Sequence, residues 1–128
     1  MRRIVIAAVV AGAAAVLAQP ASAATPSFAG SVGPGFTITM AKKPSKAGKI
    51  TLVVNDKASF HNFHLRGPGG KEISGTATTG GKKKAVTSIA TSVGSSGKTT
   101  FVLTLKKGSY TFVCDPHASQ MKGSFTVK

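Results

Sequence analysis

The sequence has few of the residues from which enzymes usually build catalytic sites. Its 128 residues include one cysteine, three histidines, three acidic residues and no tryptophan. A single cysteine excludes an internal disulfide, and in an exported protein it requires another explanation. No pair of carboxylates is spaced for acid–base catalysis. We therefore expect a protein that is not an enzyme.

The N-terminus predicts a cleavable signal peptide over residues 1–23. Arg2 and Arg3 precede an uncharged run of small and aliphatic residues, and Ala21-Ser22-Ala23 forms a small-x-small cleavage site. The run is shorter than the roughly 20 residues that a membrane-spanning helix needs. We expect export to the periplasm or the extracellular space and no membrane span after cleavage. An uncleaved membrane anchor is the alternative.

Basic residues dominate the charge of the chain. The sequence carries 17 Lys and Arg residues and a formal net charge of +14, and the signal peptide accounts for only two of those basic residues. A positive field favours encounter with acidic partners, although lysines also serve solubility alone. An exported chain without a basic helix or an aromatic-interleaved basic motif is not expected to bind nucleic acid.

Hydrophobic periodicity predicts an all-β domain over residues 36–128. Residues 24–35 are rich in Pro, Gly and Ser, which indicates a flexible lead-in. Alternating apolar and polar residues without any helical period favour a Greek-key antiparallel β-sandwich. The expected strands cover residues 36–40 with Phe36 inward, 50–54, 60–65, 99–105 and 110–114.

Residues 66–97 are the least readable part of the chain. Within them we expect a solvated loop at the lysine run 82–84 and an irregular edge strand within 85–93.

Three residues that can bind copper lie close together near the C-terminus. Cys114, His117 and Met121 follow the spacing Cys-x2-His-x3-Met. A thiolate, two imidazoles and a weak thioether form the trigonal electron-transfer site of copper proteins, so a second histidine is required. A buried inert thiol or a core methionine explains one such residue but not their joint spacing.

Strand parity selects the second histidine. Residues of one parity between 60 and 65 share a face, so His61 lies with Phe63 and Leu65 on the apolar side. That side is the core side, toward which Cys114 also points. His64 is expected to face solvent or a polar neighbour.

The combined motif resembles that of the cupredoxins, the small blue (type 1) copper proteins such as plastocyanin and amicyanin. The resemblance rests on His61-Asn62 and Cys114-Asp-Pro-His117…Met121, and it extends over residues 36–128. It implies one copper ion, which cycles between Cu(I) and Cu(II), bound by His61, Cys114, His117 and axial Met121. It also implies that Asn62 ties the ligand strand to the cysteine loop. Pro116 stiffens that loop and removes an N–H donor near the sulfur.

The resemblance implies a monomeric carrier of single electrons between redox partner proteins. The alternative is a copper-binding protein for trafficking or storage, although such proteins usually have several Met or His clusters. Multicopper oxidases and copper nitrite reductases need additional histidine-rich centres, which three histidines cannot supply. A metal-free cupredoxin-like fold is disfavoured by the complete ligand set.

Overall fold

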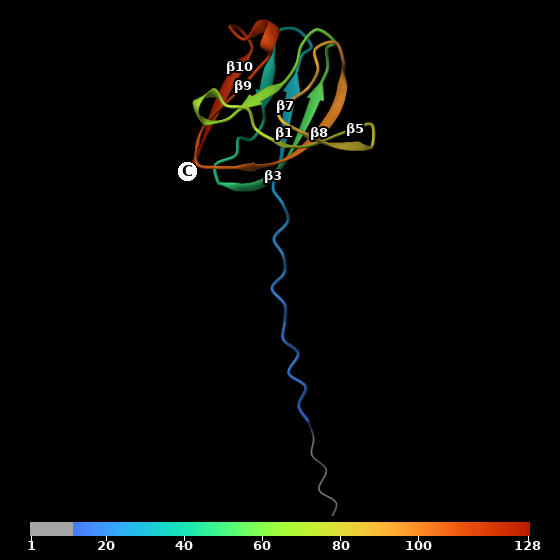
Figure 1. Ribbon diagram of the computed structural model, residues 1–128, viewed down its shortest axis with the longest axis vertical. Helices are drawn as coiled ribbons and strands as arrows, with labels where there is room; N and C mark the ends of the chain where they lie inside the picture. Colours follow the sequence, from blue (N-terminus) through green and yellow to red (C-terminus); the bar gives the residue numbers. More distant parts are fainter. Residues whose placement is uncertain (1–11) are drawn as a thin grey trace, which may run out of the picture.

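The computed structural model describes residues 12–128, and the β-sandwich begins at Ser27. Residues 12–26 contain no helix or strand and run away from the sandwich (Figure 1). Arg2, Arg3 and the first half of the apolar run of the signal peptide lie outside the described residues. Across residues 12–128, no helix has the length and apolar character needed to cross a membrane.

The described residues form two β-sheets that pack face to face (Figure 1). The six-stranded sheet has the order β2 (Ile38–Met40), β1 (Ser27–Val32), β3 (Gly48–Asp56), β8 (Gly97–Leu105), β5 (Gly75–Thr79), β6 (Lys82–Val86). The four-stranded sheet has the order β10 (Lys122–Val127), β9 (Gly108–Val113), β4 (His64–Arg66), β7 (Ile89–Ala90). Two short 3₁₀ turns, η1 (Pro68–Gly70) and η2 (Asp115–His117), complete the elements. The all-β sandwich expected from the sequence is confirmed.

The core follows the alternation of the long strands. Every second residue of β3 from Ile50 to Val54 is buried, and the matching residues of β8 from Phe101 to Leu105 are buried as well. Alternate side chains of a strand point to opposite faces, so one face of each strand contributes to the interior. The predicted strands 50–54 and 99–105 are thereby confirmed; β3 extends the first at both ends, and β8 extends the second at its N-terminal end.

The expectation of a flexible lead-in over 24–35 is wrong for residues 27–32, half of that segment. Residues 27–32 form β1, which pairs in parallel with β3 and antiparallel with β2. This pairing satisfies the backbone of β1 on both sides and buries Val32 completely. The sandwich is therefore mixed and not wholly antiparallel as expected.

The segment 66–97 contains more regular structure than its sequence indicates. It includes β5, β6 and β7, and the lysine run 82–84 belongs to β6 and not to a loop. Strand β6 lies at the edge of the larger sheet with its three lysines exposed. Charged residues on an edge strand discourage pairing with another chain, which explains lysines in a strand.

Gly30 provides a sharp test of the packing around Phe63. A Cβ atom added to Gly30 would lie 2.9 Å from one ring carbon of Phe63 and 3.1 Å from another. Overpacking of a core usually costs about 1–3 kcal/mol. We expect Gly30→Ala to lower the free energy of unfolding by about that amount, measured by denaturant titration. In the Gly30→Ala background, Phe63→Leu should recover part of the loss; equal stability of Gly30→Ala and the native chain would contradict this packing.

Candidate metal centre

The predicted ligands meet at one end of the sandwich, where η2 stands (top of Figure 1). Cys114 follows β9 directly, and His117 is the last residue of η2. His61 comes from the segment that leads into β4, which is the neighbour of β9 in the same sheet. The pairing of β4 with β9 brings these two parts of the chain together.

Three donor atoms converge at this end. The Nδ1 atoms of His61 and His117 lie 3.1 Å apart, and each lies 3.6 Å from the Sγ atom of Cys114. Cys114 and His61 are fully buried, whereas His117 is half-buried at the surface of the loop. His64 is not part of this cluster, so the choice of His61 as the second histidine is confirmed. The predicted strand over 60–65 is wrong for residues 60–63, because β4 begins only at His64 and residues 61–65 are all buried whatever their parity.

The spacing of these atoms fits a single metal ion. Metal–nitrogen bonds of about 2.0 Å and metal–sulfur bonds of about 2.3 Å, arranged trigonally, separate the ligand atoms by about 3.5–3.8 Å. The observed distances of 3.1 Å and 3.6 Å lie close to this range. One sulfur and two imidazole nitrogens are also the donor set that copper prefers in a trigonal site.

Met121 packs against Cys114, one of the three donors. It is fully buried and packs with Cys114 and Val32 in a small cluster separate from the main core. Backbone bonds hold it there, because the Cys114 N–H donates to its carbonyl at 3.0 Å and its own N–H donates to the His117 carbonyl at 2.8 Å. The loop between Cys114 and Met121 is therefore closed by its own backbone.

Two exposed phenylalanines border the histidine rings. Phe36 is 58% exposed, so the expectation that it faces the core is wrong. Its ring instead meets the edges of His61 and His117, with centroids 5.5 Å and 4.9 Å apart. Phe60 packs on His61 at 4.3 Å. The site thus has an aromatic border that the alternation of residues 36–40 did not indicate.

Asn62 connects the histidine segment to the cysteine loop, as the resemblance implies. Its backbone N–H faces the Cys114 sulfur at 3.5 Å. Its side chain accepts the Asp115 N–H at 2.8 Å and donates to the Asp115 carboxylate at 2.8 Å. Pro116 lies in the first turn of η2 and is exposed, in keeping with a role in loop stiffness.

Two carboxylates near the centre have shifted pKa values in opposite directions. Burial raises the pKa of Asp56, although hydrogen bonds from Ala58 and Thr91 and the charge of His61 partly offset this. Burial would also raise the pKa of Asp115, but hydrogen bonds from Asn62 and His64 and the charges of His64 and Arg66 outweigh it and lower this pKa. Asp115 is therefore held as a carboxylate beside the ligand loop.

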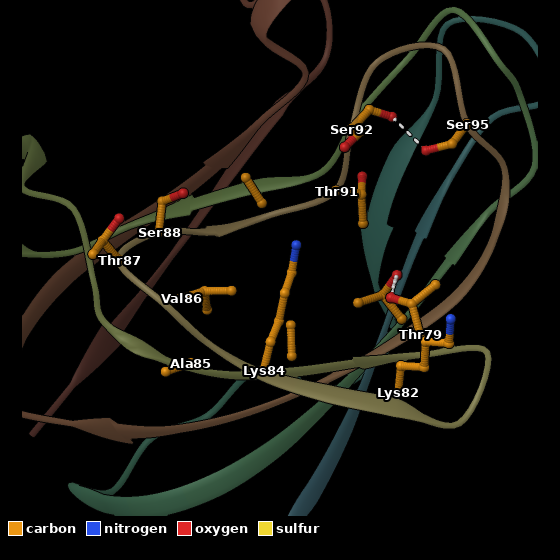
Figure 2. A pocket seen from close by; sticks show the side chains of 13 residues that line it. Thr79, Lys82, Lys84, Ala85, Val86, Thr87, Ser88, Thr91, Ser92 and Ser95 are labelled. Carbon is orange, nitrogen blue, oxygen red and sulfur yellow. Dashed lines mark hydrogen bonds between the residues drawn. The ribbon is translucent and has the colours of Figure 1, made fainter.

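One surface hollow lies on β6 and its neighbours and is not lined by the ligand cluster. It has a volume of about 700 Å³ and is lined by hydroxyl groups, small side chains and the lysines Lys82 and Lys84 of β6 (Figure 2). Its side chains hold one another, as in the 3.1 Å contact between the hydroxyls of Thr79 and Thr99. No cysteine, histidine or carboxylate lines it.

Comparison with known proteins identifies the family. The sequence profile of the copper-binding proteins of the plastocyanin/azurin family matches residues 36–128. The chain belongs to this family. Its His61, Cys114, His117 and Met121 carry the pattern of a type 1 copper site, and the predicted copper cofactor is confirmed at this level. A comparison with curated proteins finds no match.

Solved structures similar to this plastocyanin/azurin family member include two copper proteins. A mutant of amicyanin with Cu(I) is 15% identical, with 80% of this chain and 82% of that chain covered and a TM-score of 0.47. A multicopper oxidase is 12% identical, with 80% of this chain and 43% of that chain covered and a TM-score of 0.51. The oxidase likeness supports the fold alone.

Proposed function

We propose that this protein is an exported electron carrier that accepts and donates single electrons at a type 1 copper site. The observation that carries the proposal is the convergence of the Cys114 sulfur with the Nδ1 atoms of His61 and His117. Met121 is proposed as the weak axial ligand because it is buried against Cys114. When bound, copper supplies one-electron chemistry by changing between Cu(I) and Cu(II).

The protein contributes a fixed ligand geometry. Cys114 is held by backbone hydrogen bonds on both sides of the loop, and His61 is packed between aromatic rings and the core. Ligands that move little on redox change allow fast electron transfer. His117 is the ligand nearest to solvent among the three donors, so we assign it as the point of electron entry and exit.

The described residues favour a carrier over an oxidase. They contain one group of three Cys, His or carboxylate donors with metal-ligand spacing. The third histidine of the chain, His64, is bonded to Glu72 and Asp115 instead of joining a second centre. A copper enzyme with several centres therefore has too few ligands in residues 12–128.

An acidic redox partner is part of the proposal. The three acidic residues of the chain make contacts within the protein: Asp56 with Ala58 and Thr91, Asp115 with Asn62 and Glu72 with His64. The lysines of β6 are exposed. An outer surface of this sign attracts acidic proteins at low ionic strength.

Titration of the mature protein with Cu(II) tests the proposed function. One equivalent should produce an intense visible thiolate-to-copper band, because the Cys114 sulfur is positioned beside both imidazoles. Ascorbate should bleach the band, and an oxidant should restore it. The measurement is visible absorption after each addition.

Two outcomes would change the conclusion. A weak, pale spectrum would indicate ordinary nitrogen and oxygen coordination and would contradict a type 1 site. An intense band combined with slow electron exchange and large structural change would favour the alternative role in copper trafficking or storage.

A further inference from the structure

His64 is a buried histidine that the ligand cluster leaves out. It is 7% exposed, and both ring nitrogens face carboxylates. Nδ1 lies 2.9 Å and 3.1 Å from the two oxygens of Asp115, and Nε2 lies 2.8 Å from an oxygen of Glu72. Ionised carboxylates only accept hydrogen bonds, so this geometry is satisfied when both ring nitrogens donate.

A chain of hydrogen bonds through Asp115 and Asn62 links His64 to the Cys114 sulfur. The Asp115 carboxylate also accepts the side-chain amide of Asn62 at 2.8 Å and lies 3.4 Å from the Arg66 guanidinium. The carbonyl end of the Asn62 side chain accepts the Asp115 N–H at 2.8 Å. Asn62 is thereby held at both ends of its amide, and its backbone N–H faces the sulfur at 3.5 Å.

We infer that His64 is a positioning residue of the copper centre, which acts with Glu72 by holding the Asp115 carboxylate against Asn62. This keeps the Asn62 N–H directed at the Cys114 sulfur. The inference rests on the proposed copper function only for its effect on the loaded site. Hydrogen bonds to a ligand sulfur withdraw charge from it and tune the reduction potential.

Two neutral substitutions separate positioning from charge. Asparagine can place its amide nitrogen near the position of Nδ1, which faces Asp115. Glutamine can place its amide nitrogen near the position of Nε2, which faces Glu72. His64→Asn and His64→Gln both replace the imidazole ring with a neutral amide. A purely electrostatic effect of His64 would therefore be equal in the two variants.

The first measurement uses the copper-free protein. We expect hydrogen exchange of the Asn62 backbone amide to be about tenfold faster or more in His64→Gln, relative to the amides of β3, as after loss of one buried hydrogen bond. In His64→Asn the rate should stay close to that of the native chain. Equal rates in the two variants, or no change in either, would overturn the inference.

The second measurement uses the copper-loaded protein. The visible band and the reduction potential should shift in His64→Gln, with the potential falling, and should stay close to native values in His64→Asn. If the native chain gives no intense band, the proposed function fails, while the exchange result still decides the positioning role. If the native chain gives the band and both variants shift equally, the positioning role fails and the copper function stands.

A third variant, at Glu72, tests the inference without changing the buried imidazole of His64, in case the His64 variants fail to fold. The Glu72 side chain is 48% exposed, so Glu72→Ala should fold. It releases one end of His64 and should accelerate Asn62 amide exchange in the same direction by a smaller factor. If neither His64 variant folds, an unchanged hydrogen-exchange rate of the Asn62 backbone amide in Glu72→Ala would itself overturn the inference.

Discussion

Replacing Cys114 by serine is expected to abolish the intense visible absorption of the copper-loaded protein entirely. The band requires a thiolate sulfur bonded to copper, and Cys114 is the only cysteine of the chain. Its sulfur lies 3.6 Å from the Nδ1 atoms of both His61 and His117. The neighbouring thioether of Met121 cannot replace it, because a thioether has no proton to lose and cannot form a thiolate. Visible absorption after one equivalent of Cu(II) measures the effect.

The fold should survive this substitution. Serine is slightly smaller than cysteine and can accept the Asn62 N–H that now faces the sulfur. Circular dichroism of the copper-free variant should therefore match that of the native chain. An intensely blue Cys114→Ser protein would show that the ligand assignment is wrong.

Replacing Phe63 by alanine is expected to lower the free energy of unfolding by about 3–5 kcal/mol, as for other buried phenylalanines. Phe63 is fully buried and stacks on Phe112 with a centroid distance of 5.5 Å. Its backbone exchanges hydrogen bonds with Thr91, so the segment cannot easily collapse into the cavity. Denaturant titration of the copper-free protein measures the loss.

Phe36→Ala provides the matched control, because Phe36 has the same side chain but is 58% exposed. Surface substitutions usually change stability by less than about 0.5 kcal/mol, and we expect a value near that limit. Since Phe63 lies between His61 and His64 in the chain, Phe63→Ala should also weaken copper binding. Similar stability of the two alanine variants would show that Phe63 is not a main support of the core.

The composition and spacing of the sequence were enough to predict the ligand set. Cys114, His117 and Met121 lie within one loop, so their proximity follows from chain connectivity alone. The choice of His61 over His64 rested on the parity of an expected strand over 60–65. The structure has a strand only from His64 and buries both histidines, so the choice was right although its premise was not. The structure confirms that choice by placing Nδ1 of His61 3.6 Å from the Cys114 sulfur.

Some strands could not be predicted because their stability comes from remote partners. Strand β1 is rich in small residues, and its backbone is satisfied by β3 and β2 on either side. The lysines of β6 form a strand because β5 supplies the hydrogen bonds while the side chains stay in water. Local periodicity reports which face of a segment is apolar, but not which other segment supplies its hydrogen bonds.

The sequence by itself determined the fold class, the buried face of each long strand and the candidate copper ligands, since spacing and periodicity along the chain indicate these. Only the tertiary structure decided the surroundings of the site. Glu72 belongs to the segment with the weakest sequence pattern, yet it lies 2.8 Å from His64 and completes the link through Asp115 to Asn62. Such a network depends on distances between separate strands and loops, which are set by packing and not by residue spacing.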